Sequence, residues 1–264
     1  MTRQPVLEVT GLSQNFGGLR AISDLDFLVH EEEIVALIGP NGAGKTTFFN
    51  CITGIYKPTE GEVYLRGRDG ARTRLVGKKA HEITALGMAR TFQNIRIFPD
   101  MTVLENVMVG RHCRTRAGIL GAILRDARTR REEQESVDYS YELLRNLHLE
   151  HLHAEKARNL AYGAQRRLEI ARAMATEPRL LLLDEPAAGM NPQETQELEE
   201  LVKRIRTEHR LAILLIEHDM NMVMSMSDRI YVMEYGSPIA SGTPQQVRNN
   251  PHVIKAYLGE ESHA

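Results

Sequence analysis

The sequence is poor in cysteine. Only two cysteines, Cys51 and Cys113, occur among its 264 residues, and they form no CxxC pair or Cys/His cluster. We therefore expect neither a disulfide framework nor a structural zinc site. Cys51 is expected to pack as a small apolar residue.

Long apolar runs are also missing. No run approaches the roughly 20 residues that a helix needs to cross a bilayer, and the longest candidate, residues 117–124, is far too short. Residues 1–5 lack the apolar core of a signal peptide. We expect a cytoplasmic protein that meets a membrane only through a partner.

The chain has no large excess of charge of either sign. Its net charge is −2, so no global basic footprint points to nucleic acid. Hydrophobic residues make up 42% and charged residues 26%, an ordinary globular balance. The length suits one large α/β domain, or one domain with an inserted subdomain.

The most informative stretch follows an apolar strand predicted over residues 34–38. It has the spacing G-x-x-x-x-G-K-[ST] of a phosphate-binding loop, followed by a helix. The stretch comprises Gly39, Pro40, Asn41, Gly42, Ala43, Gly44, Lys45, Thr46 and Thr47. Glycines allow the backbone to wrap an anion, and the helix N-terminus presents N–H groups to phosphate. Lys45 is expected to reach the β- and γ-phosphates, and the Thr46 hydroxyl to bind Mg²⁺.

A second chemical motif ends another buried strand. Four leucines, residues 180–183, precede Asp184 and Glu185. Asp184 is expected to hold the Mg²⁺ shell, and Glu185 to polarise an attacking water. Two adjacent carboxylates need a cation nearby, because their charges otherwise repel each other.

The sequence around these motifs predicts two loops and one helical subdomain. Residues 11–18 read as a loop between two strands, and residues 67–79 as a surface loop. From residue 93 to 160 no strand-like run appears, so we expect an inserted helical subdomain. Its arginine-rich run, 111–131, reads either as a solvated helical face or as a docking segment for a membrane, nucleic acid or partner.

In these motifs the chain resembles the ATP-binding-cassette (ABC) ATPase family, over residues 6–258. The resemblance implies one α/β P-loop NTPase domain: a RecA-like core with an antiparallel β subdomain (1–92 and 161–264) and an inserted helical subdomain (93–160). It implies two cassettes that sandwich two ATP molecules head to tail.

The same resemblance assigns further residues. Gln93 matches the Q-loop and would touch Mg²⁺, His218 the switch histidine that senses the γ-phosphate, and Phe16 the aromatic that stacks on adenine. Residues 160–164 stand where the family signature Leu-Ser-Gly-Gly-Gln belongs, so Ala161 and Gly163 would meet the γ-phosphate bound by the facing subunit.

Two departures from the family pattern affect the expected dimer. Ala161 replaces the signature serine, and Asn191 replaces the usual aspartate of the D-loop. The first change removes one hydroxyl donor and the second weakens a charge. Together they put a symmetric homodimer with two equal sites in doubt.

Within the family, the stretches 161–172, 185–192, 214–220 and 242–251 are similar to LivG-type subunits of branched-chain amino-acid importers. That implies an ATP-binding and ATP-hydrolysing subunit on the inner face of the cell membrane. Its implied partners are a second cassette, two transmembrane permeases and, indirectly, a solute-binding protein.

Alternatives remain open at this point. Close relatives of the LivG type import urea or amides, or power lipopolysaccharide export. A non-transport ABC protein acting on nucleic acid would find support only in the arginine-rich run. A stand-alone P-loop kinase or GTPase leaves Gln93, His218 and the signature unexplained, and the Asn-Lys-x-Asp motif is missing where a GTPase would carry it.

Overall fold

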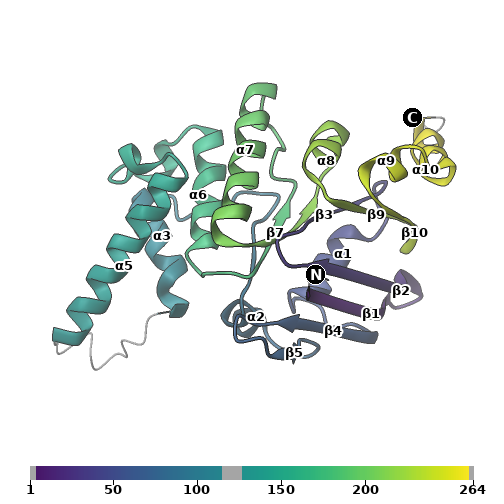
Figure 1. Ribbon diagram of the computed structural model, residues 1–264, viewed down its shortest axis with the longest axis horizontal. Coiled ribbons are helices and arrows are strands. Elements are labelled where there is room, and N and C mark those ends of the chain that lie inside the picture. The colour runs from purple at the N-terminus through teal and green to yellow at the C-terminus, as the bar shows by residue number, and fades with distance from the viewer. Residues whose placement is uncertain (1–3, 115–126, 262–264) are drawn as a thin grey trace.

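The computed structural model describes residues 4–114 and 127–261. Its strands fall in two groups along the chain, and Figure 1 shows their arrangement. The strands are β1 Pro5–Phe16, β2 Leu19–His30, β3 Ile34–Ile38, β4 Glu60–Arg66, β5 Arg72–Arg74, β6 Met88–Arg90, β7 Leu180–Asp184, β8 Ala212–Ile216, β9 Arg229–Glu234 and β10 Ser237–Gly242.

The helices alternate with the strands of the second group and also fill the middle of the chain. They are α1 Lys45–Ile52, α2 Ala80–Leu86, α3 Val103–Arg111, α5 Ala127–Asn146, α6 Tyr162–Met174, α7 Pro192–His209, α8 Met220–Met226, α9 Pro244–Arg248 and α10 Pro251–Glu261. Short 3-10 turns are η1 His112–Arg114, η2 Glu150–Leu152 and η3 Ala157–Asn159.

The strands build two sheets. A six-stranded sheet has the order β10-β9-β3-β8-β7-β6, with parallel pairing throughout except at the β9–β10 edge. An antiparallel four-stranded sheet has the order β2-β1-β4-β5. The expected α/β architecture with an antiparallel β subdomain is confirmed.

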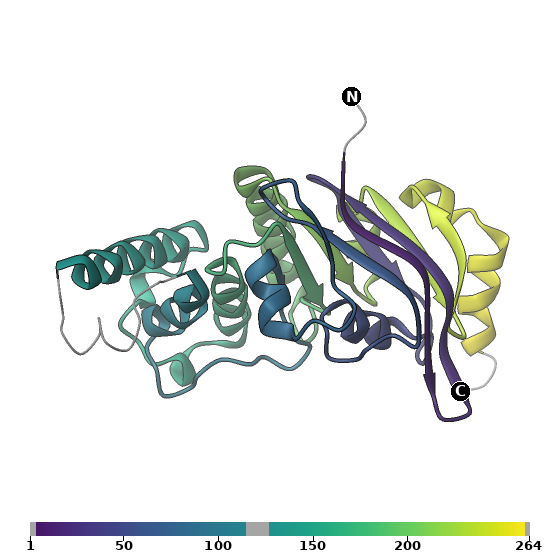
Figure 2. The same cartoon turned by 90° about the horizontal axis from the view of Figure 1, so that it is seen from below.

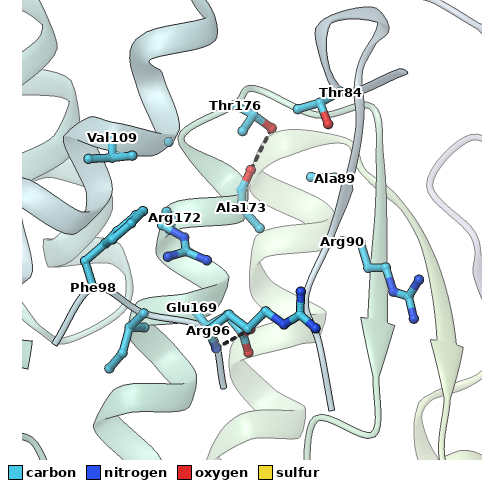
Figure 3. Close-up of a pocket in the computed structure, with 12 residues that line it drawn as sticks. Thr84, Ala89, Arg90, Arg96, Phe98, Val109, Glu169, Arg172, Ala173 and Thr176 are labelled. Atoms are coloured by element: carbon cyan, nitrogen blue, oxygen red, sulfur yellow. Dashed lines mark hydrogen bonds between the residues drawn. The ribbon is translucent and has the colours of Figure 1, made fainter. Parts of the chain in front are cut away.

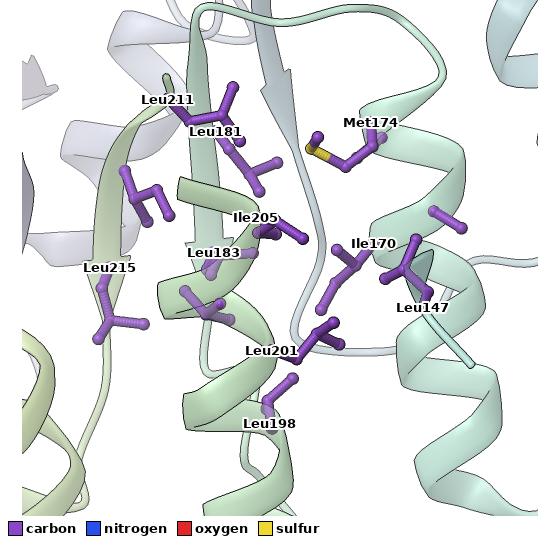
Figure 4. Packing of buried hydrophobic residues seen from close by; sticks show 14 of the residues in the cluster. Leu147, Ile170, Met174, Leu181, Leu183, Leu198, Leu201, Ile205, Leu211 and Leu215 are labelled. Atoms are coloured by element: carbon purple, nitrogen blue, oxygen red, sulfur yellow. The ribbon is translucent and has the colours of Figure 1, made fainter. Parts of the chain in front are cut away.

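The six-stranded sheet separates two hydrophobic cores, because successive residues of a strand point to opposite faces. In β3, Ile34, Ala36 and Ile38 join the core under α6, α7 and α8. Val35 and Leu37 join the core shared with the antiparallel sheet and α1. Figure 4 shows the first core, where leucines of β7 and β8 pack against α7 and α6.

The first strand is longer than the pattern predicts. The loop expected over residues 11–18 is wrong, because β1 continues to Phe16 and only Gly17 and Gly18 form the turn. Register shifts near Leu12 mark β-bulges, which allow a strand to continue through glycine and polar residues. Figure 2 shows the resulting long hairpin of β1 and β2 (purple). Strand β5 likewise interrupts the expected surface loop over 67–79.

The middle of the chain, within the described residues of 93–160, contains α3, α5 and three 3-10 turns and forms the end of the molecule farthest from the antiparallel sheet (Figure 1). A single bridge, Thr102 to Lys156, is the β pairing found there. Among the described residues, no helix is both long enough and apolar enough to cross a membrane.

The arginine-rich run 111–131 falls partly outside the described residues, and so does the apolar run 117–124. The first two arginines of the arginine-rich run, Arg111 and Arg114, bond to other parts of the chain. Arg111 forms an ion pair with Glu177 at 2.6 Å, and Arg114 donates to the Thr176 carbonyl at 2.7 Å. These two arginines tie the end of α3 to the segment that follows α6.

Candidate functional site

The phosphate-binding loop follows β3 at the carboxyl end of the parallel strands, where open α/β sheets bind ligands. Gly39 and Gly44 adopt φ values of 151° and 101°, and a Cβ at either position would meet a backbone oxygen at 2.0 Å or 2.6 Å. Only glycine fits this path. Lys45 is the first residue of α1, and its Nζ donates to the carbonyls of Gly39 at 2.5 Å and Pro40 at 2.9 Å.

A cavity of about 540 Å³ opens in front of this loop. The residues that line it come from β1 and β2, the phosphate loop, and the segments after β6, β7, β8 and β9. They are Phe16, Leu19, Arg20, Ala21, Asn41, Gly42, Ala43, Gly44, Lys45, Thr46, Thr47, Gln93, Glu185, His218, Tyr235 and Gly236. Residues predicted from separate motifs therefore face one cavity.

Glu185 stands at the centre of the hydrogen bonds in this cavity. Gln93 Nε2 donates to Glu185 Oε2 at 2.6 Å, and His218 Nε2 lies 2.6 Å from Glu185 Oε1. Glu185 is a non-glycine residue with a φ of 48°, in the left-handed region. The three side chains follow three different strands, so the sheet brings them together.

Asp184 is buried and does not line the cavity. Its Oδ2 accepts from Arg90 Nη2 at 2.6 Å, and both side chains are buried. The other arm of Arg90 donates to Asn50 Oδ1 at 2.8 Å, which ties the pair to α1. Arg90 was not singled out from the sequence, because an arginine at the end of a short strand has no distinguishing pattern.

Glu217 is a second acidic residue that the pattern did not single out. It is buried between residues 186–191, which match the family's D-loop, and the start of α8. Its oxygens accept from the backbone N–H groups of Ala187, His218 and Asp219. Burial raises the pKa of Glu217, the N–H donors oppose that shift, and the charge of Glu185 adds to it. Glu217 thus holds the segment that carries His218 against the D-loop.

Two of the residues that line the cavity, Phe16 and Tyr235, are aromatic. Phe16 and Tyr56 form an edge-to-face pair with ring centroids 5.3 Å apart. Both rings are partly exposed, which leaves apolar surface available to a flat ligand. Tyr235, in the turn between β9 and β10, is 87% exposed at the same cavity.

The residues of the predicted signature lie elsewhere. Ala161 precedes the first residue of α6 and is exposed, and Gly163 is buried in the first turn of that helix. Tyr162 between them donates its hydroxyl to the Ala188 carbonyl at 2.8 Å, which binds the signature to the D-loop. Neither Ala161 nor Gly163 lines the cavity of its own chain.

Asn191, the departure in the D-loop, has a local structural role. Its side chain accepts from the Glu194 N–H and its own N–H donates to the Glu194 carboxylate, both at 3.0 Å. This reciprocal pair is a capping box at the start of α7. The amide keeps the acceptor that an aspartate would supply there.

A second hollow, of about 410 Å³, is lined by residues of α2, β6, α3 and α6 and of the loop before α3. Phe98 and Val109 line one side, with Arg96 and Arg172 beside them (Figure 3). The Arg172 guanidinium stands 5.3 Å from the centre of the Phe98 ring, and burial lowers the pKa of Arg172. We call this hollow the α3–α6 groove; its lining includes Arg96, three residues after Gln93 of the Q-loop.

The residues present fit a magnesium nucleotide. A cradle that admits only glycine, a lysine at its edge and exposed hydroxyls suit a polyphosphate. Thr46 and Gln93 line the cavity and carry hard oxygen atoms, and the buried carboxylate of Asp184 immediately precedes Glu185, which also lines it. Among the described residues, no cluster of three His, Cys, Asp or Glu suited to a metal ion occurs.

Comparisons with known proteins agree with this geometry. A family model described as ABC transporter matches residues 22–188, and one described as branched-chain amino acid ATP-binding cassette transporter matches residues 237–263. The chain is 51% identical over 257 residues to the high-affinity branched-chain amino acid transport ATP-binding protein LivG of Escherichia coli, covering 97% of this chain and 99% of that protein.

Solved structures with the same fold include ATP-binding cassettes. The crystal structure of an ABC transporter cassette in its ADP conformation superposes with a TM-score of 0.83 at 31% identity, covering 97% of this chain and 99% of that one. A dimeric structure of a bacterial ABC transporter cassette has a TM-score of 0.73 at 25% identity, covering 90% and 98%. The chain belongs to the ATP-binding cassette family of ABC transporters, in the LivG-type group.

Proposed function

We propose that this chain is the subunit that binds and hydrolyses ATP to power a transporter of branched-chain amino acids. One observation carries the proposal: Gln93, Glu185 and His218 meet in a single cavity in front of the phosphate-binding loop. The name of the relative at 51% identity supports the amino-acid cargo.

Binding of the nucleotide rests on the loop and on the aromatic residues that line the cavity. The backbone N–H groups of residues 42–46 and the N-terminus of α1 hold the phosphates. Lys45, held at the loop by the Gly39 and Pro40 carbonyls, reaches the β- and γ-phosphates. Phe16 offers its exposed face to the adenine ring.

Hydrolysis rests on Glu185. Its carboxylate accepts the proton of the attacking water, while Gln93 and His218 hold it from either side. Magnesium, when it arrives with ATP, neutralises the phosphate charge. Thr46, Gln93 and Asp184 are the residues that would hold it, and Arg90 is already bonded to Asp184.

A second cassette completes the site. Ala161 and Gly163, at the start of α6, do not line the chain's own cavity, and in the assembled dimer the N-terminus of α6 would face the γ-phosphate held by the other subunit. A dimeric solved relative supports such an arrangement. Because Ala161 supplies no hydroxyl, a partner that differs from this chain would give two unequal sites.

The α3–α6 groove is the candidate docking site for a transmembrane permease. Phe98, in the loop before α3, and Val109 of α3 line the groove with Arg96 and Arg172, so a docking helix with apolar residues and an acidic side chain would match it. The groove adjoins the Q-loop, and nucleotide state would reach the permease by this route. Through two permeases the chain would stay at the inner, cytoplasmic face of the cell membrane, with a solute-binding protein on the other side and no contact with nucleic acid.

Catalytic turnover tests the proposal directly. Glu185→Gln should bind Mg-ATP with near-unchanged affinity, lose at least about 100-fold in kcat and accumulate as a dimer on a sizing column. Glu200→Gln, at an exposed position of α7, is the matched control and should keep the wild-type rate. Wild-type turnover in Glu185→Gln would overturn the assignment of the base.

Association with permeases is a separate test. The chain should co-purify with permeases that are encoded beside it, and charge reversal in the groove by Arg172→Glu should break that association while ATP binding survives. Arg210→Glu, an exposed reversal at the end of α7, serves as the control. A chain that never associates with permeases, with or without ATP, would contradict the transport role.

A further inference from the structure

Arg166, in helix α6, is a fully buried arginine whose bonds lead to the catalytic segments. Its Nη1 donates to the Phe92 carbonyl at 2.7 Å and to Glu169 Oε2 at 2.9 Å. Its Nη2 donates to the Gln93 carbonyl at 2.9 Å and to the Glu185 carbonyl at 3.3 Å. One guanidinium therefore connects α6, the Q-loop and Glu185, the residue that follows β7.

Glu169, one turn further along α6, completes the connection. It is 2% exposed, and its Oε1 accepts from the backbone N–H groups of Phe92 and Arg96, both at 3.2 Å. The buried pair thus binds the Q-loop through carbonyls on one side and through N–H groups on the other. We call Arg166 and Glu169 the α6 clasp.

A buried ion pair of this kind lowers the stability of the fold unless its hydrogen bonds offset the free energy of desolvation. Removing two opposite charges from water costs several kcal/mol per ion, and their attraction offsets this only with additional hydrogen bonds. An apolar pair of similar volume on α6 would pack without that cost. The clasp instead places fixed donors against two carbonyls whose residues, Gln93 and Glu185, bond to each other across the cavity.

We propose that Arg166 is a positioning residue for ATP hydrolysis, which with Glu169 holds Gln93 and Glu185 in register from helix α6. The bond to the Glu185 carbonyl supports a residue in the left-handed region, where a side chain is strained and an unsupported backbone would relax. The proposal rests on the proposed role of Glu185 as the base.

The test compares Arg166→Gln, Arg166→Lys and Glu169→Gln in the full-length chain. Arg166→Gln should lower kcat for ATP at least about tenfold while KM and the Mg-ATP dissociation constant stay within about twofold, because the binding loop is untouched. Arg166→Lys should have a kcat between those of Arg166→Gln and the wild type, since an ammonium group keeps the positive charge but lacks the planar fork of donors.

Amide hydrogen exchange supplies a local readout. Arg166→Gln should accelerate exchange in the segments around 92–96 and 185–188 and leave the segment after β3 unchanged. Arg229→Gln is the matched control, because Arg229 also bridges segments, donating to the Leu28 carbonyl and to Glu33, at the opposite end of the strands. It should lower Tm without changing kcat.

The outcomes separate this inference from the proposed function. If Glu185→Gln loses hydrolysis while Arg166→Gln keeps the wild-type kcat, the clasp has no positioning role. A joint loss of kcat, ATP binding and Tm in both Arg166→Lys and Glu169→Gln would show a purely structural pair and overturn it too. If Glu185→Gln hydrolyses ATP normally, the proposed function itself fails.

Discussion

The two cysteines show how burial sets the reactivity of a residue. Cys51 lies buried in α1, as its sequence context predicted, and its Sγ is 3.7 Å from Gln14 Oε1. Burial raises the pKa of Cys51 to about 12. Cys113 is exposed in η1, the short turn that directly follows α3. Since the thiolate is the reactive form, the two thiols should differ sharply.

We predict that a thiol reagent at about pH 8 labels one cysteine per folded chain quickly and the second only on unfolding. Cys113→Ser should abolish the fast phase, as measured by the absorbance of the released thiolate. Fast labelling that survives in Cys113→Ser would mean that the helix after the phosphate loop opens readily.

Individual helices depend on residues at their ends. The capping box at the start of α7 explains why Asn191 tolerates the D-loop position: its Oδ1 accepts from the Glu194 N–H as an aspartate would. The other end of α7 carries His209, which is half-buried although a helix C-terminus favours a positive charge. We therefore predict how substitutions of Asn191 and His209 change the stability of the fold.

Asn191→Ala should lower the free energy of unfolding by about 1 kcal/mol, because it leaves an N–H group at the start of α7 without its acceptor. Asn191→Asp should retain the stability of the wild type. Urea unfolding followed by circular dichroism measures both variants. Equal losses in the two would contradict the capping role.

Burial lowers the pKa of His209. The charge of Arg68 lowers this pKa further, and the charge of Glu208 raises it. The unfolded chain therefore takes up a proton at higher pH than the folded chain, and stability present above the ordinary value of 6.5 is lost as the pH falls. Between about pH 7.5 and pH 5.5, Tm should fall more steeply in the wild type than in His209→Gln. Parallel curves by differential scanning fluorimetry would disprove this.

At the scale of the whole molecule, the parallel sheet gathers functional residues at one edge. The phosphate loop, Glu185 and His218 follow the carboxyl ends of β3, β7 and β8, which are adjacent in the sheet. The two hydrophobic cores on its faces hold those ends in place. A nucleotide bound at this edge contacts segments from many parts of the chain.

Mg-ATP should therefore stabilise the entire fold. At a concentration of about 100 times the dissociation constant, ligand binding adds about 2.7 kcal/mol to the free energy of unfolding, and Tm should rise accordingly. Lys45→Ala should abolish that rise, while Lys203→Ala, on the partly exposed face of α7, should preserve it. An unchanged rise in Lys45→Ala would place the nucleotide elsewhere.

Local patterns were sufficient wherever chemistry depends on consecutive residues. The phosphate loop, the apolar strand before it, and the adjacent acids at 184 and 185 could be recognised because each is a short run with its own physical logic. The loop expected over residues 11–18 failed for the opposite reason. A bulged strand has no period, and its pairing with β2 and β4 decides its conformation.

The sequence by itself determined the class of fold, the phosphate-binding loop, the candidate base Glu185 and the family to which they point. Only the tertiary structure decided that Arg90 holds Asp184, that Glu217 braces the segment of His218, and that Arg166 binds both the Q-loop and Glu185. Three of these hydrogen bonds join residues that are far apart in the sequence. The separation is 19 positions for Arg166 and Glu185, 73 for Arg166 and Gln93, and 94 for Arg90 and Asp184. Contacts at such separations arise from packing, so no local pattern encodes them.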